Sequence, residues 1–362
     1  MFDLKAHLKT LVEAHAPSGH EAPLRELVQS AWKGLVDSTE QDRLGSLIGI
    51  KRATQPPETR RKIMLAAHMD EIGMMVRDVV DGFVYVQRIS GVDNRVMLAQ
   101  TVMVHGRQPL PGIIATVPPH LLKNGNGNGK YPEFDSFVVD LGLPADEVAR
   151  LVRMGDLITV DVPMIDLNSN RVAGKAMDDR ACVAAVTLCL HLLQKMHHSW
   201  DVYAVATVQE ESGLLGAKTS AYHIKPDIAI ALDVTFAKQP GVPDDKAIEM
   251  NGGPGIGIGP NFHPKLYDKL RETARKHEIK LQDDLIPGAS GTDAWAIQVA
   301  LEGVPTALLE VPIRNMHSAV ETADLRDIER CGRLLAAFIA DLDKDFLTAI
   351  AWEDLKAQEA TT

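Results

Sequence analysis

Two adjacent glutamates, Glu210 and Glu211, follow a run of β-forming residues at positions 201–208. Neighbouring residues on an extended segment point to opposite sides, so these two carboxylates cannot perform the same task. At the end of a buried strand, one carboxylate could bind a metal ion while the other acts as a general acid or base. An adjacent glutamate pair is more commonly part of a solvated turn. The functional interpretation therefore needs support from the rest of the chain.

A second chemically suggestive pair, His68 and Asp70, follows the basic-to-apolar run at positions 61–67. Residues two apart on a strand face the same side. His68 could therefore bind a metal ion while Asp70 orients the imidazole ring. A structural His–Asp pair without a metal is the commoner alternative when such a pair occurs alone.

In three further segments, an aspartate or histidine lies at the end of a long apolar run. Asp233 follows the apolar run 227–232, His317 follows the apolar run 304–311, and Asp178-Asp179 precedes a long apolar helix. Capping of that helix would explain one aspartate but not two of them. Ligands of open α/β sheets bind outside the carboxyl ends of the strands, so we expect these residues to meet in one site.

The predicted site contains two histidines and several carboxylates, which suits two divalent metal ions sharing one bridging carboxylate. His68 and Asp233 would hold one ion, Glu211 and His317 the other, and an aspartate of the 178–179 pair would bridge them. Metal ions ~3.5–4 Å apart polarise a carbonyl and lower the pKa of a bridging water. Glu210 is then the spare carboxylate that could move the proton. A serine mechanism is not supported, because the chain has no GxSxG motif.

Composition limits the alternatives. The chain has 362 residues, of which 45% are hydrophobic and 24% are charged, and this suits two globular domains. A net charge of -11 without a basic patch makes nucleic acid an unlikely partner. No apolar stretch approaches the ~20 residues that span a bilayer. With three cysteines, no CxxC motif and no apolar signal-peptide core, we expect a cytoplasmic protein with no membrane partner.

The periodicity predicts an α/β domain interrupted by a β-rich insertion. Short alternating runs between Gly, Pro and Asn predict a small all-β barrel or sandwich at 74–165, leaving 1–73 and 166–362 as the α/β domain. We expect His105 and His120 to be structural or surface residues, with a smaller chance that His120 reaches the site. The 123–130 segment reads as a flexible tip. Helices are expected at 2–16, 21–37, 146–153, 181–196, 213–222, 265–277, 294–302 and 324–347, and a further strand at 279–285.

Six segments together resemble the motifs of one enzyme family: HMDEIG, GKAMDDR, VQEESG, ALDV, GTDA and PIRNMHS. They are similar to those of the TET-type dinuclear metallo-aminopeptidases, also called the glutamyl aminopeptidase or endoglucanase-like family. The similarity runs over nearly the whole chain. Two metal-free carboxylates, as in glycosidases, do not match this histidine-containing set.

The resemblance implies a mixed α/β sheet flanked by helices, of the zinc-peptidase type, with an inserted all-β dimerisation domain. It implies two divalent metal ions, Zn or Co, and a homododecamer built from dimers that admits short peptides with a free N-terminus. Carried over position by position, it also assigns the site residues. Asp178 becomes the bridging ligand, Asp70 the residue that orients His68 and Glu210 the general base, and the metal ligands are His68, Asp178, Glu211, Asp233 and His317.

The expected reaction is removal of N-terminal residues from short peptides by a hydroxide that bridges the two metal ions. The sequence departs from the family at Cys182, where members commonly have glycine, and in the unusual 123–130 loop. Two alternatives stay open at this stage. One is a metal-dependent N-acyl amino acid deacylase, with Arg314 as a candidate for the substrate carboxylate. The other is a non-enzymatic assembly subunit. The preferred N-terminal residue, the physiological metal and the choice between dimer and dodecamer are not readable from the sequence.

Overall fold

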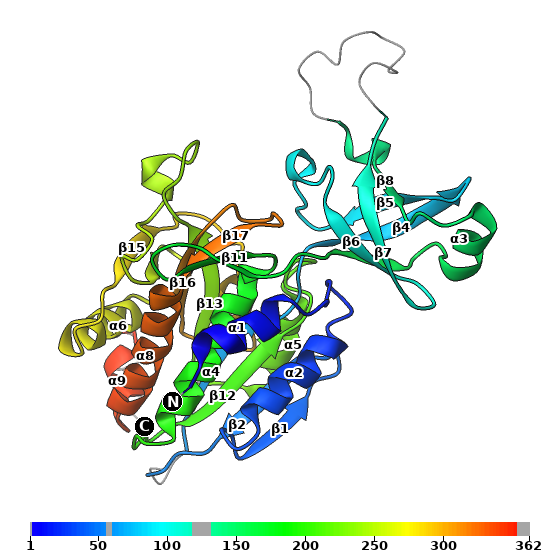
Figure 1. The fold of residues 1–362 in the computed structure, drawn as a ribbon. Coiled ribbons are helices and arrows are strands. Elements are labelled where there is room, and N and C mark those ends of the chain that lie inside the picture. Colours follow the sequence, from blue (N-terminus) through cyan, green and yellow to red (C-terminus); the bar gives the residue numbers. More distant parts are fainter. Residues whose placement is uncertain (1, 56–59, 118–131, 353–362) are drawn as a thin grey trace.

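The chain folds into a helix-flanked sheet and a small β-barrel that projects to one side of it (Figure 1). The computed structural model describes residues 2–55, 60–117 and 132–352. The predicted fold class, a mixed α/β sheet with an inserted all-β unit, is confirmed. Within the described ranges, none of the helices combines the length and apolarity that crossing a bilayer requires.

The sheet has four parallel strands at its centre: β12 (Asp201–Thr207), β3 (Lys62–His68), β13 (Ile228–Phe236) and β16 (Thr306–Arg314). The path β1-β2-β12-β3-β13-β16-β17-β11-β10 includes five outer strands, which are β1 (Ser38–Gln41), β2 (Leu47–Lys51), β17 (Glu321–Asp324), β11 (Arg171–Gly174) and β10 (Ile165–Asp166). Two more, β14 (Gly255–Ile258) and β15 (Gln282–Leu285), join beside β16. The carboxyl ends of the four central strands therefore meet at one edge.

Helices cover both faces of the sheet, and the alternation of side chains along each strand fills both cores. Along β3, Ile63 and Leu65 pack into one hydrophobic cluster and Met64 into the other. Among the described residues, six helices contribute to the larger cluster: α1 (Leu4–Val12), α2 (Ala22–Trp32), α4 (Met177–Leu193), α6 (Pro264–Lys276), α8 (Leu325–Asp341) and the short α9 (Phe346–Ile350). The smaller cluster is closed by α5 (Leu215–Ile224) and α7 (Asp293–Ile297).

The β-rich insertion forms a closed barrel with its own hydrophobic core. Its strands, in the order in which they pair, are β4 (Gly73–Val80), β5 (Phe83–Ile89), β8 (Val138–Asp140), β7 (Pro109–Ala115), β6 (Thr101–His105) and β9 (Leu157–Val160), and α3 (Ala145–Leu151) packs beside them. His105 bonds to Thr159 Oγ1 at 2.9 Å within the barrel. His120 and the 123–130 loop lie outside the described residues.

The prediction of a helix at 21–37 is wrong at its carboxyl end. Helix α2 stops at Trp32, because Gly34 adopts a left-handed conformation at φ +79° and turns the chain. The strands β1 and β2 that follow were not predicted. The apolar stripe does continue through Leu35 and Val36, which pack against the larger core from a turn.

Three other predicted helices are too long. The first ends at Val12 rather than residue 16, and α7 ends at Ile297 rather than residue 302. The last breaks after Asp341, where Leu342 adopts an extended conformation. In each case the hydrophobic pattern continues past the break, since the following turn still packs against the core.

A buried ion cluster ties the end of β3 to the first helices. Glu71 lies three residues after His68, and it accepts hydrogen bonds from Lys175 Nζ at 2.7 Å and Arg180 Nη2 at 3.1 Å. All three side chains are buried. Glu71 also accepts the Ala16 N–H at 2.9 Å. Burial alone would raise the pKa of Glu71, but the charges of Lys175 and Arg180 outweigh it and hold the pKa below its ordinary value of 4.5.

We predict that Glu71→Gln lowers the free energy of unfolding by about 3–5 kcal/mol, because it leaves two buried cations without a counter-charge. Denaturant unfolding at neutral pH measures this loss. The matched control is Asp166→Asn, which breaks an exposed ion pair with Lys5 and should cost no more than about 1 kcal/mol.

The same ion cluster predicts an acid sensitivity. Since the pKa of Glu71 is lowered by folding, its contribution is complete at neutral pH and is lost as the pH falls below 4.5. The stability of the wild type should therefore fall more steeply than that of Glu71→Gln in that range. Equal acid profiles of the two proteins would contradict the assignment.

Candidate metal centre

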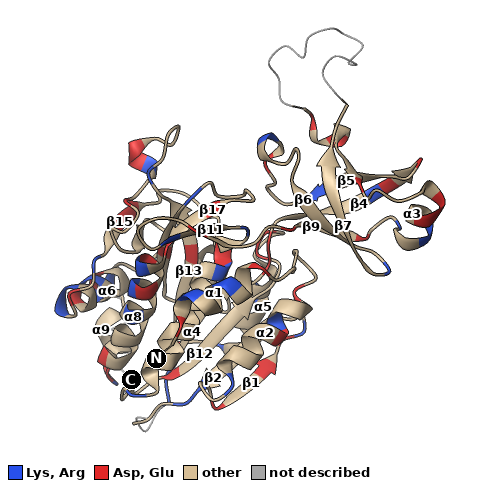
Figure 2. Cartoon of the chain, in the orientation of Figure 1, with Lys and Arg blue, Asp and Glu red and all other residues tan. Residues whose placement is uncertain are grey.

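The carboxyl edge of the central strands collects acidic residues, whose positions are coloured red on the ribbon in Figure 2. His68 is the last residue of β3, and Glu210 and Glu211 follow β12 after a short turn. His317 follows β16 by three residues. Asp233 lies inside β13, which runs on to Phe236, so the predicted end of this strand at residue 232 is wrong.

The structure brings five of the predicted residues into two groups of three. His68, Asp178 and Asp233 form one group, and Asp178, Glu211 and His317 form the other. Within each group, one candidate ligand atom per residue lies within 4.8 Å of the others. His68 Nε2 lies 3.0 Å from Asp178 Oδ1, and His317 Nε2 lies 3.3 Å from Asp178 Oδ2. The two oxygens of Asp178 therefore face different histidines.

A kink in the first turn of α4 decides which aspartate faces the histidines. Asp178 and Asp179 have non-helical backbone angles, and the N-cap residue of α4 is Ala176, so the alternative that one of the two aspartates serves as the N-cap is not supported. Asp179 Oδ2 instead accepts the His68 N–H at 3.2 Å. Its Oδ1 is buried without a hydrogen-bond partner among the described residues. Asp179 thus supports the strand end from behind while Asp178 points into the site.

Asp70 organises the backbone of the glutamate pair. Its two carboxylate oxygens accept the N–H groups of Glu210 at 3.0 Å and Glu211 at 3.1 Å. His68 Nδ1 lies 3.1 Å from the Asp70 carbonyl oxygen and 3.6 Å from Asp70 Oδ1. This fully buried residue therefore connects the ends of β3 and β12.

Sequence reasoning missed three residues that hold the site. Glu321 accepts the Asp178 N–H at 3.1 Å and the His317 N–H at 2.7 Å. Ser90, which follows barrel strand β5, donates to Glu211 Oε2 at 2.7 Å. The Gly91 carbonyl oxygen lies 3.2 Å from His317 Nδ1.

Only Glu321 had a signal in the sequence, because it lies four residues after His317. Gly91 is 226 residues away from His317 in the chain. A Cβ atom added at Gly91 would lie 2.5 Å from His317 Nδ1, so the close approach requires glycine at this position.

The site carries more negative charge than its two histidines can balance. Burial raises the pKa of Glu210 to about 9 and also raises the pKa values of Glu211 and Asp233, and neighbouring carboxylates add to each rise. For Asp178, hydrogen bonds from both histidines outweigh burial and hold its pKa below the ordinary range. The Asp178 carboxylate in turn raises the pKa of His317 to about 9. Cations are the natural complement of such a set.

The residues present fit divalent metal ions. Each group supplies three nitrogen and oxygen ligands, which leaves room for water or substrate as in catalytic zinc sites. Imidazole with carboxylate suits Zn and neighbouring transition metals better than Ca or Mg. Glu210 belongs to neither group, although its Oε2 lies 3.9 Å from His68 Nε2.

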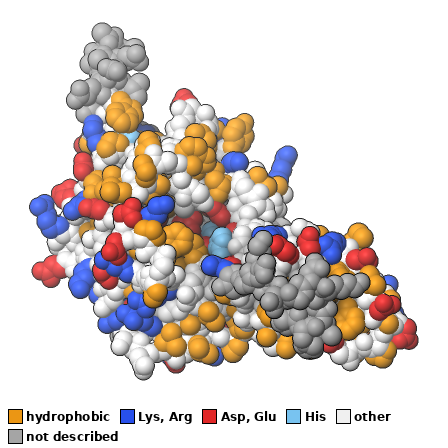
Figure 3. All heavy atoms as spheres, turned by 90° about the horizontal axis from the view of Figure 1, so that it is seen from above, with side chains coloured by type: hydrophobic (Ala, Val, Ile, Leu, Met, Phe, Trp, Pro, Cys, Tyr) orange, Lys and Arg blue, Asp and Glu red, His pale blue; other side chains and the backbone are white. Residues whose placement is uncertain are grey.

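The two groups open onto a cavity of about 510 Å³. Figure 3 shows a hollow in the surface between the sheet and the barrel, with acidic and histidine side chains inside it. Beyond the site residues, the cavity is lined by the 284–292 segment, Glu310 and residues 234–236 at the end of β13. Arg314, the candidate for binding a substrate carboxylate, does not line it and donates to the Lys238 carbonyl oxygen.

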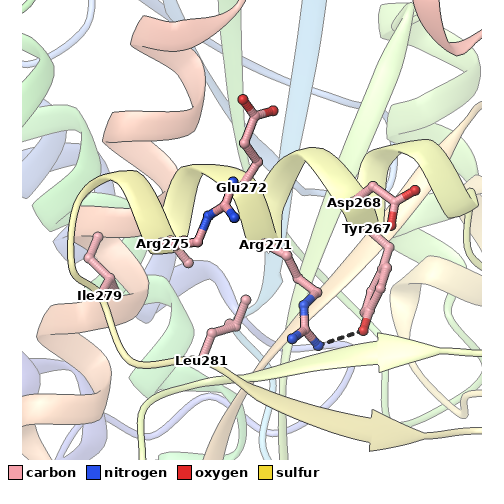
Figure 4. A pocket seen from close by; sticks show the side chains of 8 residues that line it. Tyr267, Asp268, Arg271, Glu272, Arg275, Ile279 and Leu281 are labelled. Atoms are coloured by element: carbon pink, nitrogen blue, oxygen red, sulfur yellow. Dashed lines mark hydrogen bonds between the residues drawn. The ribbon is translucent and has the colours of Figure 1, made fainter.

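A second hollow, of about 500 Å³, lies along α6 (Figure 4). Arg271 on its wall donates a hydrogen bond to the Tyr267 hydroxyl at 2.8 Å and forms an ion pair with Asp283. Its lining includes no histidine or cysteine. We therefore assign no chemistry to it.

Comparison with known proteins agrees with this geometry. Residues 45–334 match the family model described as M42 glutamyl aminopeptidase. The chain is 37% identical over 340 residues to a lysyl aminopeptidase of Pyrococcus furiosus, covering 92% of this chain and 96% of that protein.

Solved structures show the same relationship. The aminopeptidase APDkam598 of Desulfurococcus kamchatkensis superposes with a TM-score of 0.89 at 38% identity, covering 96% of this chain and 98% of that one. The TET1 peptidase of Pyrococcus horikoshii, which can assemble into a tetrahedron or a large octahedral shell, gives a TM-score of 0.81 at 29% identity, covering 94% of this chain and 100% of that one. This chain therefore belongs to the M42 glutamyl aminopeptidase family of metal-dependent aminopeptidases.

Proposed function

We propose that this chain releases N-terminal residues from short peptides at the two residue groups that share Asp178. The observation that carries the proposal is the arrangement of these groups on the floor of one cavity, with the unassigned carboxylate of Glu210 beside them. Family membership supports the aminopeptidase reaction and does not favour a deacylase or a non-enzymatic subunit.

In this proposal, His68 and Asp233 hold one divalent ion, Glu211 and His317 hold a second, and Asp178 bridges the two. Zn or Co suits the nitrogen and oxygen ligands. When bound, such a pair polarises the scissile carbonyl and lowers the pKa of an attacking water. Asp70 and Glu321 keep the ligands in place through the hydrogen bonds described above.

Glu210 is the proposed general base. Its carboxylate lines the cavity and lies beside the metal groups without belonging to either. From there it can take a proton from the attacking water and deliver it to the leaving amine. The remaining negative charge favours the α-ammonium group of a free N-terminus over an acylated one.

The barrel is the proposed dimerisation domain. It exposes several large apolar side chains: Met75, Val80, Phe83 and Ile113. We propose a homo-oligomer, with a dodecamer built from dimers as its form, by analogy with the tetrahedral assembly of the P. horikoshii relative. Light scattering of the purified protein would count the subunits, and a monomer would exclude the assembly.

We also place the enzyme in the cytoplasm. The support is that Cys182, Cys189 and Cys331 are buried free thiols, as expected in a reducing compartment. Cys182 donates to the Asp233 carbonyl oxygen at 3.0 Å, so it contributes a packing contact next to the site. Fractionation of the source cells would test the assignment.

We predict that peptides with free N-termini release amino acids when Zn or Co is added, whereas matched N-acetylated peptides do not. The reason is that the acidic site needs the α-ammonium group. Chelation should abolish the release. Quantifying free amino acids measures both effects, and cleavage of the acetylated peptides would move the function to a deacylase.

For the general base, we predict that Glu210→Gln keeps its bound metal but loses kcat by on the order of 10²-fold or more. The substitution preserves size and removes only the proton acceptor. Steady-state kinetics and metal analysis of the same sample separate the two effects. Normal turnover in the metal-loaded variant would refute the assignment of Glu210.

A third prediction concerns the contact between barrel and site. Gly91→Ala places a methyl group against the His317 ring and should weaken metal binding at the Glu211–His317 group by roughly 10–100-fold. Metal titration measures the affinity. Ser90→Ala is a milder variant for comparison, because it removes the hydrogen bond to Glu211 without adding bulk. Unchanged affinity in Gly91→Ala would mean that the barrel does not position His317.

A further inference from the structure

Glu310 is a buried carboxylate that neither metal group uses. It lies in β16, is only 3% exposed and lines the same cavity as the metal groups. Its Oε2 has no hydrogen-bond partner among the described residues. A buried acceptor of this kind is costly unless something satisfies it, so its presence in a substrate cavity points to a ligand that does.

The position of Glu310 follows from the register of the sheet. It pairs with Asp233 on the neighbouring parallel strand, so both side chains project from the same face. Thr235 lies two residues beyond Asp233 and faces the same way. Glu310 is therefore one strand farther from the metal groups than Asp233, along the wall of the same cavity.

A second carboxylate stands next to it. Asp284 in β15 also lines the cavity, and its Oδ2 accepts a hydrogen bond from Thr235 Oγ1 at 2.7 Å. Burial raises the pKa of the Glu310 carboxyl well above its usual range, and Asp284 raises it further. The two carboxyls are close enough to share a proton, and a cationic group between them would replace that proton and satisfy the free oxygen of Glu310.

The remaining lining suits an alkyl chain that ends in such a cation. Leu285, Ile286 and Pro287 follow Asp284 along the cavity wall and supply apolar surface. One residue argues the other way: Lys246 also lines the cavity and could attract an acidic side chain. However, Lys246 is exposed, whereas Glu310 is buried. Because an electrostatic interaction is stronger where water is excluded, Glu310 should determine the preferred substrate side chain more strongly than Lys246 does.

We propose that Glu310 and Asp284 form the end of the subsite that receives the side chain of the peptide's first residue, and that this side chain is a cationic one, lysine or arginine. The proposal rests on the proposed aminopeptidase function and specifies its substrate class. Glu310 and Asp284 would act as specificity-determining residues and take no part in the bond-breaking step.

The test compares peptides that differ only in their first residue: lysine, arginine, norleucine, leucine or glutamate. Norleucine has the alkyl chain of lysine without the ammonium group, so it isolates the charge. We expect the kcat/KM of the metal-loaded wild type for lysine or arginine to exceed that for norleucine by roughly 10- to 100-fold. Equal or faster cleavage of the norleucine or glutamate peptide would overturn the inference while leaving the aminopeptidase function intact.

Glu310→Gln supplies the matched variant, since it keeps the shape and removes the charge. We expect its lysine-to-norleucine ratio of kcat/KM, measured on the same sample, to fall by at least about tenfold. Lys246→Met is the opposing control. A loss of glutamate cleavage in that variant, with an unchanged lysine ratio in Glu310→Gln, would assign the opposite preference.

Binding of free amino acids gives a measurement that needs no variant. Calorimetry on the metal-loaded wild type should show tighter binding of L-lysine than of L-norleucine, and equal affinities would overturn the inference. If no peptide of any kind is cleaved, the aminopeptidase function itself fails and this proposal fails with it.

Discussion

The concentration of buried carboxylates at the carboxyl edge of the sheet is the constraint on which the rest of this structure depends. Parallel strands bring Asp233, the glutamate pair and both histidines to one place, and burial makes the negative charges costly without cations. Divalent metal ions resolve this cost and supply the chemistry together. Asp70 and Glu321 are stabilised in a different way. Each accepts hydrogen bonds from backbone N–H groups, which offset the cost of burying its negative charge.

The barrel is connected to this constraint directly. Ser90 and Gly91 reach from the end of β5 to Glu211 and His317, so an element of the inserted unit completes the surroundings of the candidate metal groups. On the other side of the site, the ion cluster around Glu71 holds the end of β3 against the N-terminal helices. The metal groups therefore lie between two supports that are distant in sequence.

The substrate selection that we propose follows from the same sheet register. Asp233 faces the metal groups, and its register partner Glu310 faces the deeper wall of the cavity. In the proposed function, one strand pair would carry a metal-binding residue and a recognition residue, separated by a single strand spacing of ~4.8 Å. This arrangement permits the side-chain preference to change at β15 and β16 without disturbing the ligands.

The sequence by itself determined the α/β class and the β-rich insertion, and it singled out the residues that meet in the two candidate metal groups, because each lies next to a strongly apolar run. Periodicity could not determine where α2 ends, since Leu35 and Val36 continue its apolar stripe from a turn. Spacing could not choose between Asp178 and Asp179; the family resemblance chose Asp178, and the tertiary structure shows that Asp178 faces the histidines while Asp179 holds the His68 backbone. Tertiary structure alone brought Gly91 to His317 and left Glu310 Oε2 without a hydrogen bond among the described residues, because contacts between distant segments depend on strand register and domain packing rather than on local pattern.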